Sequence, residues 1–442
     1  MKLFLWAIAI LLGSTYVAAQ SAADPVLMRE INSIKALDNH THVPKVLAAG
    51  QKDDDYDALP CGNNLEPIAD PGMARPENPL FLQSWKALYG YKYDDKSPEH
   101  VRQLLDDVQR VRREQGDNFP TWVLDKLNIQ YMLANRVAMG PGLKPPRFLW
   151  VPFDDALMLP LNNQSVANET PDRKFFYGRE EMLLRRYVSE SNLQRIPAIL
   201  DHYVDQVIAP TLQRQKQAGA VAVKFEAAYL RSLNFGEPNR EAANFTYAQF
   251  FRGGVPKKAD YLNLQDVLFR EIARRAGELG LAVHIHTGAG CGGYFQVSGS
   301  NPALLDSVIN DASLRKTNFV LIHGGAGPYP KVTAFLLSKP NVYADFSEQD
   351  WMLSSRALSA VIRDWLEWYP EKILFGTDLF PGSSPEYDWE EIGYMTATTG
   401  RQALGLALTG MMQDGEITRE RASELARMVL IGNAVKLYRL QR

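Results

Sequence analysis

The stretch LQDVLFREIARRAGELGLAVHIH (residues 264–286) joins two different periodicities and decides the expected fold. Apolar residues recur at helical spacing from Leu264 to Leu279, where Asn263 can begin the helix and Gly280 can end it. The residues that follow, LAVHIH, form a short, nearly continuous apolar run, which is typical of a strand buried on both faces of a parallel sheet. A helix that leads directly into such a strand predicts an α/β architecture.

Seven further apolar runs repeat this pattern along the chain. Together they give eight strand candidates: KALDNHTHV (35–43), IQYMLAN (129–135), RFLWVPF (147–153), AVAVKF (220–225), LAVHIH (281–286), NFVLIH (318–323), NVYADFS (341–347) and KILFGTD (372–378). Eight strands alternating with helices favour a closed (β/α)8 TIM barrel over an open doubly wound sheet, and no GxGxxG turn follows the first strand. A helix capped by Ser97 is expected over 98–115, and the segment 416–442 is expected to close the chain with C-terminal helices.

The first residues have the layout of a signal peptide. Lys2 precedes an apolar run over 3–12, and Val17-Ala18-Ala19 suits cleavage after Ala19. The apolar run is shorter than the roughly 20 residues that a membrane-spanning helix needs. We therefore expect residues 1–19 to be removed, an exported protein that is periplasmic or secreted, and one barrel domain over 20–442 with an insertion at about 44–97.

The composition limits the partners of the protein. The chain has 48 Lys+Arg against 51 Asp+Glu, so its net charge of −3 offers no strong field for nucleic acid or for an anionic membrane. A small-molecule substrate is the expected partner, and a homodimer is the common expectation for such an assembly. The two cysteines, Cys61 and Cys291, exclude a disulfide scaffold and a multi-cysteine metal site, and the sequence leaves open whether they pair.

Histidine is scarce but concentrated. The chain has 7 histidines, and two His-X-His pairs occur, His40/His42 and His284/His286, where random placement predicts about 0.1 pairs. Residues two apart on a strand point to the same side, so His40 and His42 can bind one ion, and Asp378 at the end of the eighth strand can complete its ligands. Active sites of α/β barrels are built at these strand ends. The alternative is that these are ordinary hydrogen-bonded polar groups.

Several stretches resemble the amidohydrolase superfamily, and most closely its amidohydrolase-related branch, which includes decarboxylases, lactonases and relatives of uronate isomerase. They are DNHTH (38–42), VKFEAAYLR (223–231), HIHTGAG (284–290), LIHGGAGPYP (321–330), VYADFS (342–347), LFGTD (374–378) and IGNAVKLYRL (431–440). The resemblance covers most of the chain from Leu37 onward and is weak over 44–130 and 161–200.

The resemblance implies a divalent metal, with zinc as the expected ion. Its implied ligands are His40, His42, His286 and Asp378, whereas His284 becomes a supporting residue. Members of the family with two ions carry a carboxylated lysine at the position of Lys224. If Lys224 is carboxylated, His323 binds a second ion; otherwise His323 is an acid–base group and Lys224 lies beside a single ion. Lys224 can also simply end its strand.

The expected reaction is hydrolysis of an amide, ester or lactone bond in a small, carboxylate-bearing substrate. Asp378 would accept the proton of the metal-bound water, and His323 would stabilise the developing oxyanion. Tyr229 and Arg231 are candidates for binding the substrate carboxylate, and the alternative is a packing tyrosine beside a solvated arginine. Other functions that remain open are a decarboxylase or a sugar-acid isomerase on the same barrel, and an exported binding protein without turnover.

Overall fold

The computed structural model describes residues 22–48, 50–62, 64–382, 384 and 386–440. The expected signal peptide therefore lies outside the described residues. Each of the eight predicted strands is present within its predicted segment. They are β1 (Ala36–Thr41), β2 (Ile129–Asn135), β3 (Phe148–Val151), β4 (Ala222–Phe225), β5 (Ala282–His286), β6 (Phe319–Ile322), β7 (Val342–Asp345) and β8 (Ile373–Leu374).

All neighbouring strands are parallel and follow the order of the sequence. Hydrogen-bonded ladders join β1-β2-β3 and β4-β5-β6-β7-β8, and parallel bridges such as Phe153–Lys224 connect the two sets. The barrel closes between its first strand and the segment after β8, where the Asn39 N–H donates to the Phe375 carbonyl at 2.9 Å and the Asp378 N–H to the His40 carbonyl at 2.8 Å. The prediction of a closed (β/α)8 barrel is confirmed.

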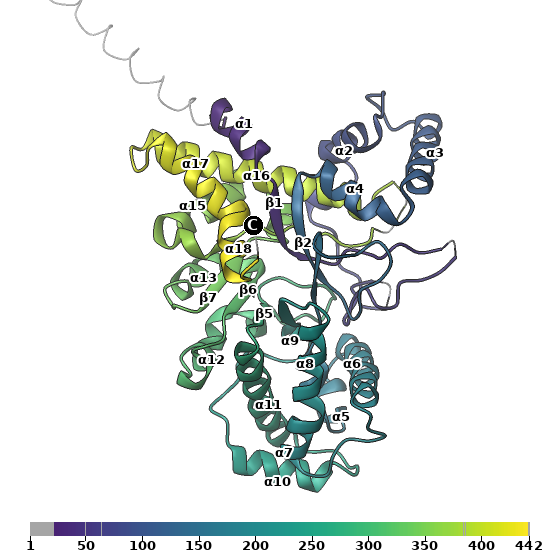
Figure 1. Ribbon diagram of the computed structural model, residues 1–442, viewed down its shortest axis with the longest axis vertical. Helices are drawn as coiled ribbons and strands as arrows, with labels where there is room; N and C mark the ends of the chain where they lie inside the picture. Colours follow the sequence, from purple (N-terminus) through teal and green to yellow (C-terminus); the bar gives the residue numbers. More distant parts are fainter. Residues whose placement is uncertain (1–21, 49, 63, 383, 385, 441–442) are drawn as a thin grey trace, which may run out of the picture.

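Helices surround the barrel (Figure 1). They are α1 (Pro25–Ser33), α2 (Pro79–Tyr89), α3 (Pro98–Gln115), α4 (Phe119–Lys126), α5 (Gln164–Ala167), α6 (Pro171–Glu190), α7 (Leu200–Tyr203), α8 (Ala209–Gln217), α9 (Ala227–Leu230), α10 (Arg240–Phe250), α11 (Lys258–Glu278), α12 (Asp306–Ile309), α13 (Pro330–Leu336), α14 (Gln349–Met352), α15 (Ser355–Trp368), α16 (Trp389–Gln413), α17 (Arg419–Arg427) and α18 (Asn433–Leu437). None of the described helices is long and apolar enough to cross a membrane.

The helix predictions hold, but neither expected N-terminal cap forms a side-chain capping bond. The predicted helix 98–115 is α3; Ser97 stands at its N-cap position without a side-chain capping hydrogen bond, and the helix ends at Gly116, which has φ +49°. The helix expected from Leu264 is α11, which begins earlier, at Lys258. Asn263 does not cap it, because its side chain bonds the backbone N–H and carbonyl of Asn239 at 2.8 and 2.9 Å. The predicted C-terminal helices are α17 and α18.

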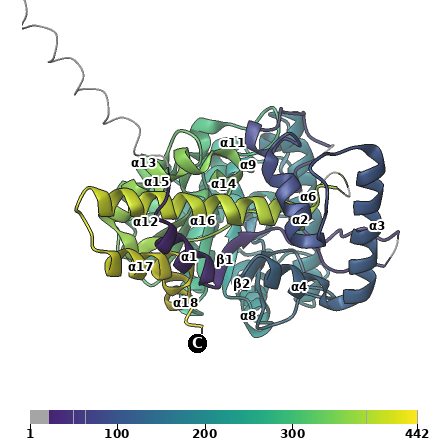
Figure 2. The same ribbon diagram turned by 90° about the horizontal axis from the view of Figure 1, so that it is seen from above.

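The insertion after β1 contributes to the core. Its helix α2 packs against α16, the long helix that crosses the view in Figure 2. Phe81 and Trp85 of α2 are buried in a cluster with Val108 of α3 and Trp389 of α16. Because these apolar side chains leave water together, the insertion is anchored at one side of the barrel rather than loosely attached.

Candidate functional site

The predicted site residues gather at one end of the barrel, beyond the carboxyl ends of the strands. His40 lies in β1, Lys224 in β4 and His286 at the end of β5, while His323 and Asp378 follow β6 and β8. All are buried, with at most 9% of each residue exposed. His323 and Asp378 have φ values of +65° and +53°, so the chain turns sharply at both residues as it leaves the sheet.

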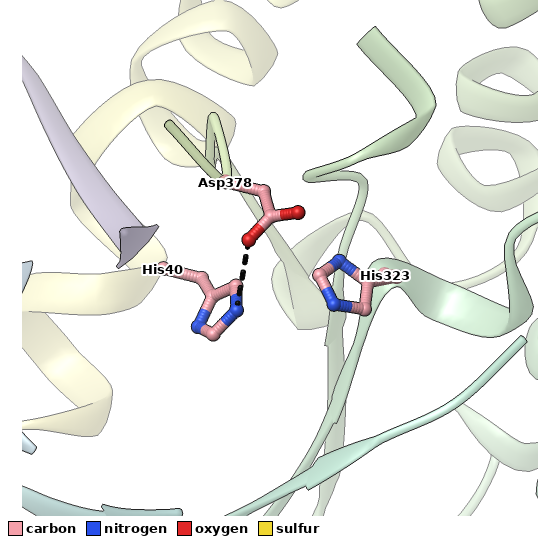
Figure 3. Close-up of side chains that lie close together, drawn as sticks. All are labelled: His40, His323 and Asp378. Atoms are coloured by element: carbon pink, nitrogen blue, oxygen red, sulfur yellow. Dashed lines mark ion pairs between the residues drawn. The ribbon is translucent and has the colours of Figure 1, made fainter. Parts of the chain in front are cut away.

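His40, His323 and Asp378 form one compact group, here called the histidine–aspartate group. A ligand nitrogen of each histidine and a carboxylate oxygen of Asp378 all lie within 4.8 Å of one another. The His40 Nε2 atom is 3.2 Å from the Asp378 Oδ1 atom (Figure 3). Two imidazoles and a carboxylate from three different strand ends make a ligand set suited to zinc or a similar divalent ion.

Hydrogen bonds fix the His323 ring. Its Nδ1 atom lies 2.9 Å from the Ser347 hydroxyl oxygen, and that hydroxyl donates to Asp345 at 2.7 Å. Because the single hydroxyl proton is used on Asp345, the serine oxygen accepts the Nδ1 proton of His323. The lone pair of the neutral ring is then on Nε2, where it is available to an ion or to a substrate proton.

His40 is held from two sides. Its Nδ1 atom is 2.7 Å from the Asn135 side-chain amide, and its Nε2 atom is 3.3 Å from the Lys224 Nζ atom. Lys224 is completely buried, and the nearest carboxylate to its ammonium group is Glu226, at 4.0 Å. Lys224 therefore lies between the histidine–aspartate group and a second set of polar residues.

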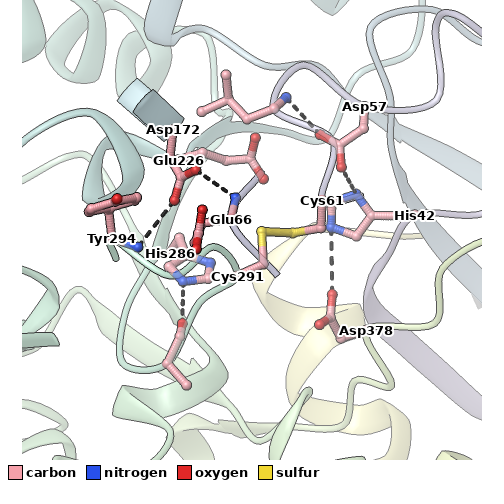
Figure 4. Close-up of a disulfide and its surroundings, with 12 residues drawn as sticks. His42, Asp57, Cys61, Glu66, Asp172, Glu226, His286, Cys291, Tyr294 and Asp378 are labelled. Carbon is pink, nitrogen blue, oxygen red and sulfur yellow. Dashed lines mark hydrogen bonds and ion pairs between the residues drawn. A yellow bond between two sulfur atoms is a disulfide. The ribbon is translucent and has the colours of Figure 1, made fainter. Parts of the chain in front are cut away.

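That second set combines His42, which the sequence predicted as a ligand beside His40, with two carboxylates that the sequence did not predict. His42, Asp57 and Glu226 each offer a ligand atom within 4.8 Å of the others, and we call them the acidic group. The His42 Nδ1 atom is 3.1 Å from Asp57, and its Nε2 atom is 3.5 Å from Asp378 (Figure 4). Glu226 lies two residues after Lys224, a spacing that predicts side chains on the same face of an extended segment. No pattern in the sequence predicts that Asp57 lies here.

The two histidines of the second His-X-His pair have other partners. The His286 Nε2 atom is 2.6 Å from the carbonyl oxygen of Ala289, and since a carbonyl only accepts, this nitrogen carries the proton. His286 belongs to neither group, and only its Nδ1 atom remains as a potential ligand. The His284 Nε2 atom lies 2.7 Å from the Tyr438 hydroxyl, which matches the supporting role expected for His284.

Of the two predicted substrate-binding residues, the structure keeps only Tyr229 near the site. The Tyr229 ring centroid is 4.7 Å from that of His286. Arg231 is a correction: it is buried, and its guanidinium donates to Asp266 at 2.7 Å, to Gln265 at 3.0 Å and to nearby backbone carbonyls. Every guanidinium nitrogen of Arg231 is hydrogen-bonded to its own loop or to α11. Arg231 therefore stabilises the fold and is not placed to bind a substrate carboxylate.

Burial sets the charge state of the site. It raises the pKa of Asp378 to about 8, and it lowers the pKa values of His40 and His323 well below their usual value, with the Lys224 ammonium adding to the lowering. The imidazoles are thus neutral at pH 7, which is the form that binds metals. A divalent cation would favour the ionised form of Asp378, so these residues fit such an ion.

A disulfide holds the insertion over the site. Cys61 and Cys291, whose pairing the sequence left open, are bonded, with their Cα atoms 5.9 Å apart and a sequence separation of 230. Cys61 is close in sequence to Asp57 of the acidic group, and Cys291 is close to Ala289, whose carbonyl accepts from His286 (Figure 4). The bond therefore ties together two loops that position polar residues of the site.

A buried carboxyl beside the site gives the first testable prediction. Burial raises the pKa of Asp154 to about 7, and its Oδ1 atom accepts from Gln215 at 2.7 Å. The Asp154 carboxyl keeps its proton up to about pH 7 in the folded protein, whereas in the unfolded chain it loses the proton near the ordinary pKa of 3.8. Because the unfolded state loses the proton first, the contribution of Asp154 to folding stability falls as the pH rises from about 4 to 7. Asp154→Asn should remove that cost, so urea unfolding should show the variant more stable than wild type by up to about 4 kcal/mol at pH 8 and by little at pH 4. An equal difference at both pH values would contradict this account.

Similar solved structures share the whole fold. A protein from Lactobacillus casei described as a metal-dependent hydrolase superposes with a TM-score of 0.60 at 14% identity, covering 96% of this chain and 100% of that one. Glucuronate isomerase from Caulobacter crescentus gives 0.60 at 12% identity and covers 94% of each chain. Uronate isomerase from Thermotoga maritima gives 0.54 at 13% identity, over 94% of this chain and 98% of that one.

Sequence comparisons identify the family. Fold and site together define a (β/α)8 barrel with candidate metal ligands at the carboxyl ends of its strands. The amidohydrolase family model matches residues 196–440, more than half of the chain, so this protein belongs to the amidohydrolase family and is an enzyme of the amidohydrolase superfamily. Protein fluG of Emericella nidulans is 32% identical over 162 residues, which are 36% of this chain but only 17% of that relative.

Proposed function

We propose that this protein is an exported, metal-dependent hydrolase that cleaves an amide, ester or lactone bond of a small substrate. The observation that carries the proposal is the histidine–aspartate group, in which His40, His323 and Asp378 lie within reach of one ion. Zinc is the first candidate, because two imidazoles and one carboxylate leave a position open for water. A bound ion would lower the pKa of that water and polarise the scissile carbonyl.

Residues of the chain itself would transfer the proton, orient the reacting groups and stabilise the developing charge. Asp378, held at a turn after β8, accepts the proton of the attacking water and delivers it to the leaving group. The His323 ring is fixed by Ser347, so its Nε2 atom would be held in one orientation toward the ion. The Lys224 ammonium, buried beside His40, stabilises negative charge that develops on the substrate oxygen. The barrel end buries these groups, which strengthens each electrostatic interaction.

Tyr229 is the remaining candidate for substrate contact. It is partly buried, close to His286 and Phe295, with ring centroids 4.7 and 5.1 Å away. Aromatic side chains at such a position present a rigid apolar wall with one polar end. The substrate is therefore expected to place an apolar part against Tyr229 while its reactive bond faces the histidine–aspartate group.

Export is part of the proposal. The signal-peptide layout of residues 1–19 supports it, and the Cys61–Cys291 disulfide is of a kind that forms and persists in oxidising compartments.

Oxygen-18 labelling tests the proposed reaction. The full chain, stripped with a chelator and reloaded with zinc, is incubated in H2 18O with a panel of lactones, aryl esters and N-acyl amino acids. We expect product carrying one solvent oxygen, and no turnover before the metal is restored. Carbon dioxide release without solvent oxygen in the product would instead identify a decarboxylase, and metal-independent hydrolysis would contradict the proposed role of the site.

A sugar-acid isomerase is the second candidate, because two of the similar structures are uronate and glucuronate isomerases. Uronates added to the same panel test it. Interconversion of the aldose and ketose forms, with no hydrolysis of any ester, amide or lactone, would replace the hydrolase proposal by this one.

A further inference from the structure

We propose that a cavity on the flank of the barrel binds a small carboxylic acid with an apolar body, such as an arylalkanoic acid. The cavity has a volume of about 410 Å³ and is bordered by the loop after β2, by β3, by the end of α6 and by α8. We call it the flank cavity, and its lining includes Val137, Met139, Trp150, Arg186, Arg214 and Gln215. The described residues that line it belong neither to the histidine–aspartate group nor to the acidic group, so binding there does not depend on the hydrolysis proposed above.

One part of the flank cavity is apolar. Val137 and Met139 follow β2, Trp150 belongs to β3, and all three are only half-buried. The Trp150 indole N–H donates to the Arg136 carbonyl at 2.9 Å, which holds the ring in place. Ligand pockets measure roughly 300–1,000 Å³ and are lined mainly by apolar and aromatic side chains with a few polar groups. The flank cavity has this size and this kind of lining, so the apolar body of a ligand would cover these side chains.

Arg214 is the lining residue placed to bind a carboxylate. Arg186 is already paired with two carboxylates, at 2.8 and 3.0 Å. Arg214 has only a distant ion pair, with Glu190 at 3.6 Å, and its guanidinium donates to the hydroxyl oxygens of Thr211 at 3.0 Å and Ser191 at 3.3 Å. A guanidinium group forms its strongest hydrogen bonds with carboxylates, often two at once. A ligand carboxylate would therefore be a better partner for Arg214 than the two hydroxyl groups.

The buried part of the lining is bonded to the barrel. Gln215 donates to the Asp154 carboxyl at 2.7 Å, and the Tyr187 hydroxyl donates to the Phe153 carbonyl at 2.7 Å. Gln215 and Tyr187 are 3% and 4% exposed. These bonds fix the helices α6 and α8 against the segment after β3, so the cavity is formed before a ligand arrives and little ordering is required on binding.

The charge of the lining selects an acid over other small molecules. The lining holds two arginines and one carboxylate, that of Glu190. A cationic ligand would be repelled by both guanidinium groups, and a neutral ligand would leave Arg214 without a close anion. An arylalkanoic acid matches both parts of the cavity, because its ring lies against the apolar side chains while its carboxylate reaches Arg214.

Titration calorimetry with 4-phenylbutyrate tests the site. The full chain is titrated after removal of metal with a chelator and again after reloading with zinc, and 4-phenylbutyramide serves as the neutral ligand of the same shape. We expect one 4-phenylbutyrate per chain in both metal states, and affinity for the amide about tenfold weaker or less. Arg214→Gln should weaken binding of the acid by about tenfold or more and leave that of the amide unchanged.

Two further variants make the test specific to this cavity. Ala218→Trp places an indole in the cavity from an exposed position on its lining, so it should abolish binding of both ligands. Arg185→Gln is the matched control, because Arg185 is an exposed arginine of α6 outside the lining, and it should bind like wild type. Thermal unfolding shows whether each variant folds, and the two independent cavity variants keep the test decisive if one does not.

Four outcomes would overturn the proposal. They are no binding of 4-phenylbutyrate in either metal state, binding only when zinc is present, equal affinity for the acid and the amide, and equal effects of Arg214→Gln and Arg185→Gln. Binding that requires zinc would place the acid at the histidine–aspartate group. Absence of hydrolysis with binding intact would count against the proposed function and not against this cavity.

Discussion

Asp378→Asn is expected to lower kcat/KM by about 10³-fold or more, because the amide can neither ligate the ion as an anion nor accept the proton of the water. The substitution should leave the fold intact. Asp378 has φ +53°, a backbone conformation that asparagine adopts readily, and asparagine has nearly the same shape. The measurement is steady-state kinetics on any substrate that the wild type turns over, together with the metal content of the purified variant.

Asp154→Asn is the matched control for this loss. Asp154 is also a completely buried carboxyl at this end of the barrel, but its partner is Gln215 rather than a histidine. It should keep wild-type kinetics and metal content within a few-fold. If Asp378→Asn retained full activity, or if both variants lost activity equally, Asp378 would not be the group that activates water.

Breaking the disulfide should have the largest effect on stability. The Cys61–Cys291 bond closes a loop of 230 residues, and its removal frees the unfolded chain over that whole length. Cys61→Ser/Cys291→Ser is expected to lower the free energy of unfolding by about 3–5 kcal/mol. The insertion that carries Asp57 should also be less firmly held over the barrel.

Urea unfolding with and without dithiothreitol measures this effect. Wild type should lose stability on reduction and become similar to the double variant, whereas the double variant should not respond to the reductant. A reductant-induced fall of equal size in both proteins would show that the effect does not come from this bond. Equal stability of all four samples would show that the bond contributes nothing to the folded state.

The strands and the histidine–aspartate group could be predicted from sequence for the same physical reason. A buried parallel strand requires a short apolar run, and a polar residue directly after such a run must lie at the carboxyl end of the barrel. His40, His323 and Asp378 each satisfy this condition, but so do His42 and His286, so local pattern places all five residues at this end of the barrel and does not decide which of them share an ion.

The positions of Asp57, Arg231 and His286 were not predicted correctly, because they are set by contacts that the local sequence pattern does not contain. Asp57 reaches His42 because the insertion folds back over the barrel and is bonded to Cys291, far away in the sequence. Arg231 was expected at the site, but its partners Gln265 and Asp266 lie on α11, 34 and 35 residues further along the chain. The His286 ring lies beside the His323 ring, with centroids 4.7 Å apart, but its Nε2 atom faces a carbonyl of its own turn.

The most direct test of the central claim is anomalous diffraction at the zinc edge from crystals of the full chain grown with zinc. The account predicts an anomalous peak bonded by His40, His323 and Asp378, at about 2.0–2.2 Å from their ligand atoms. A fully zinc-loaded crystal with no peak in the histidine–aspartate group, or with its only peak held by other residues, would contradict it.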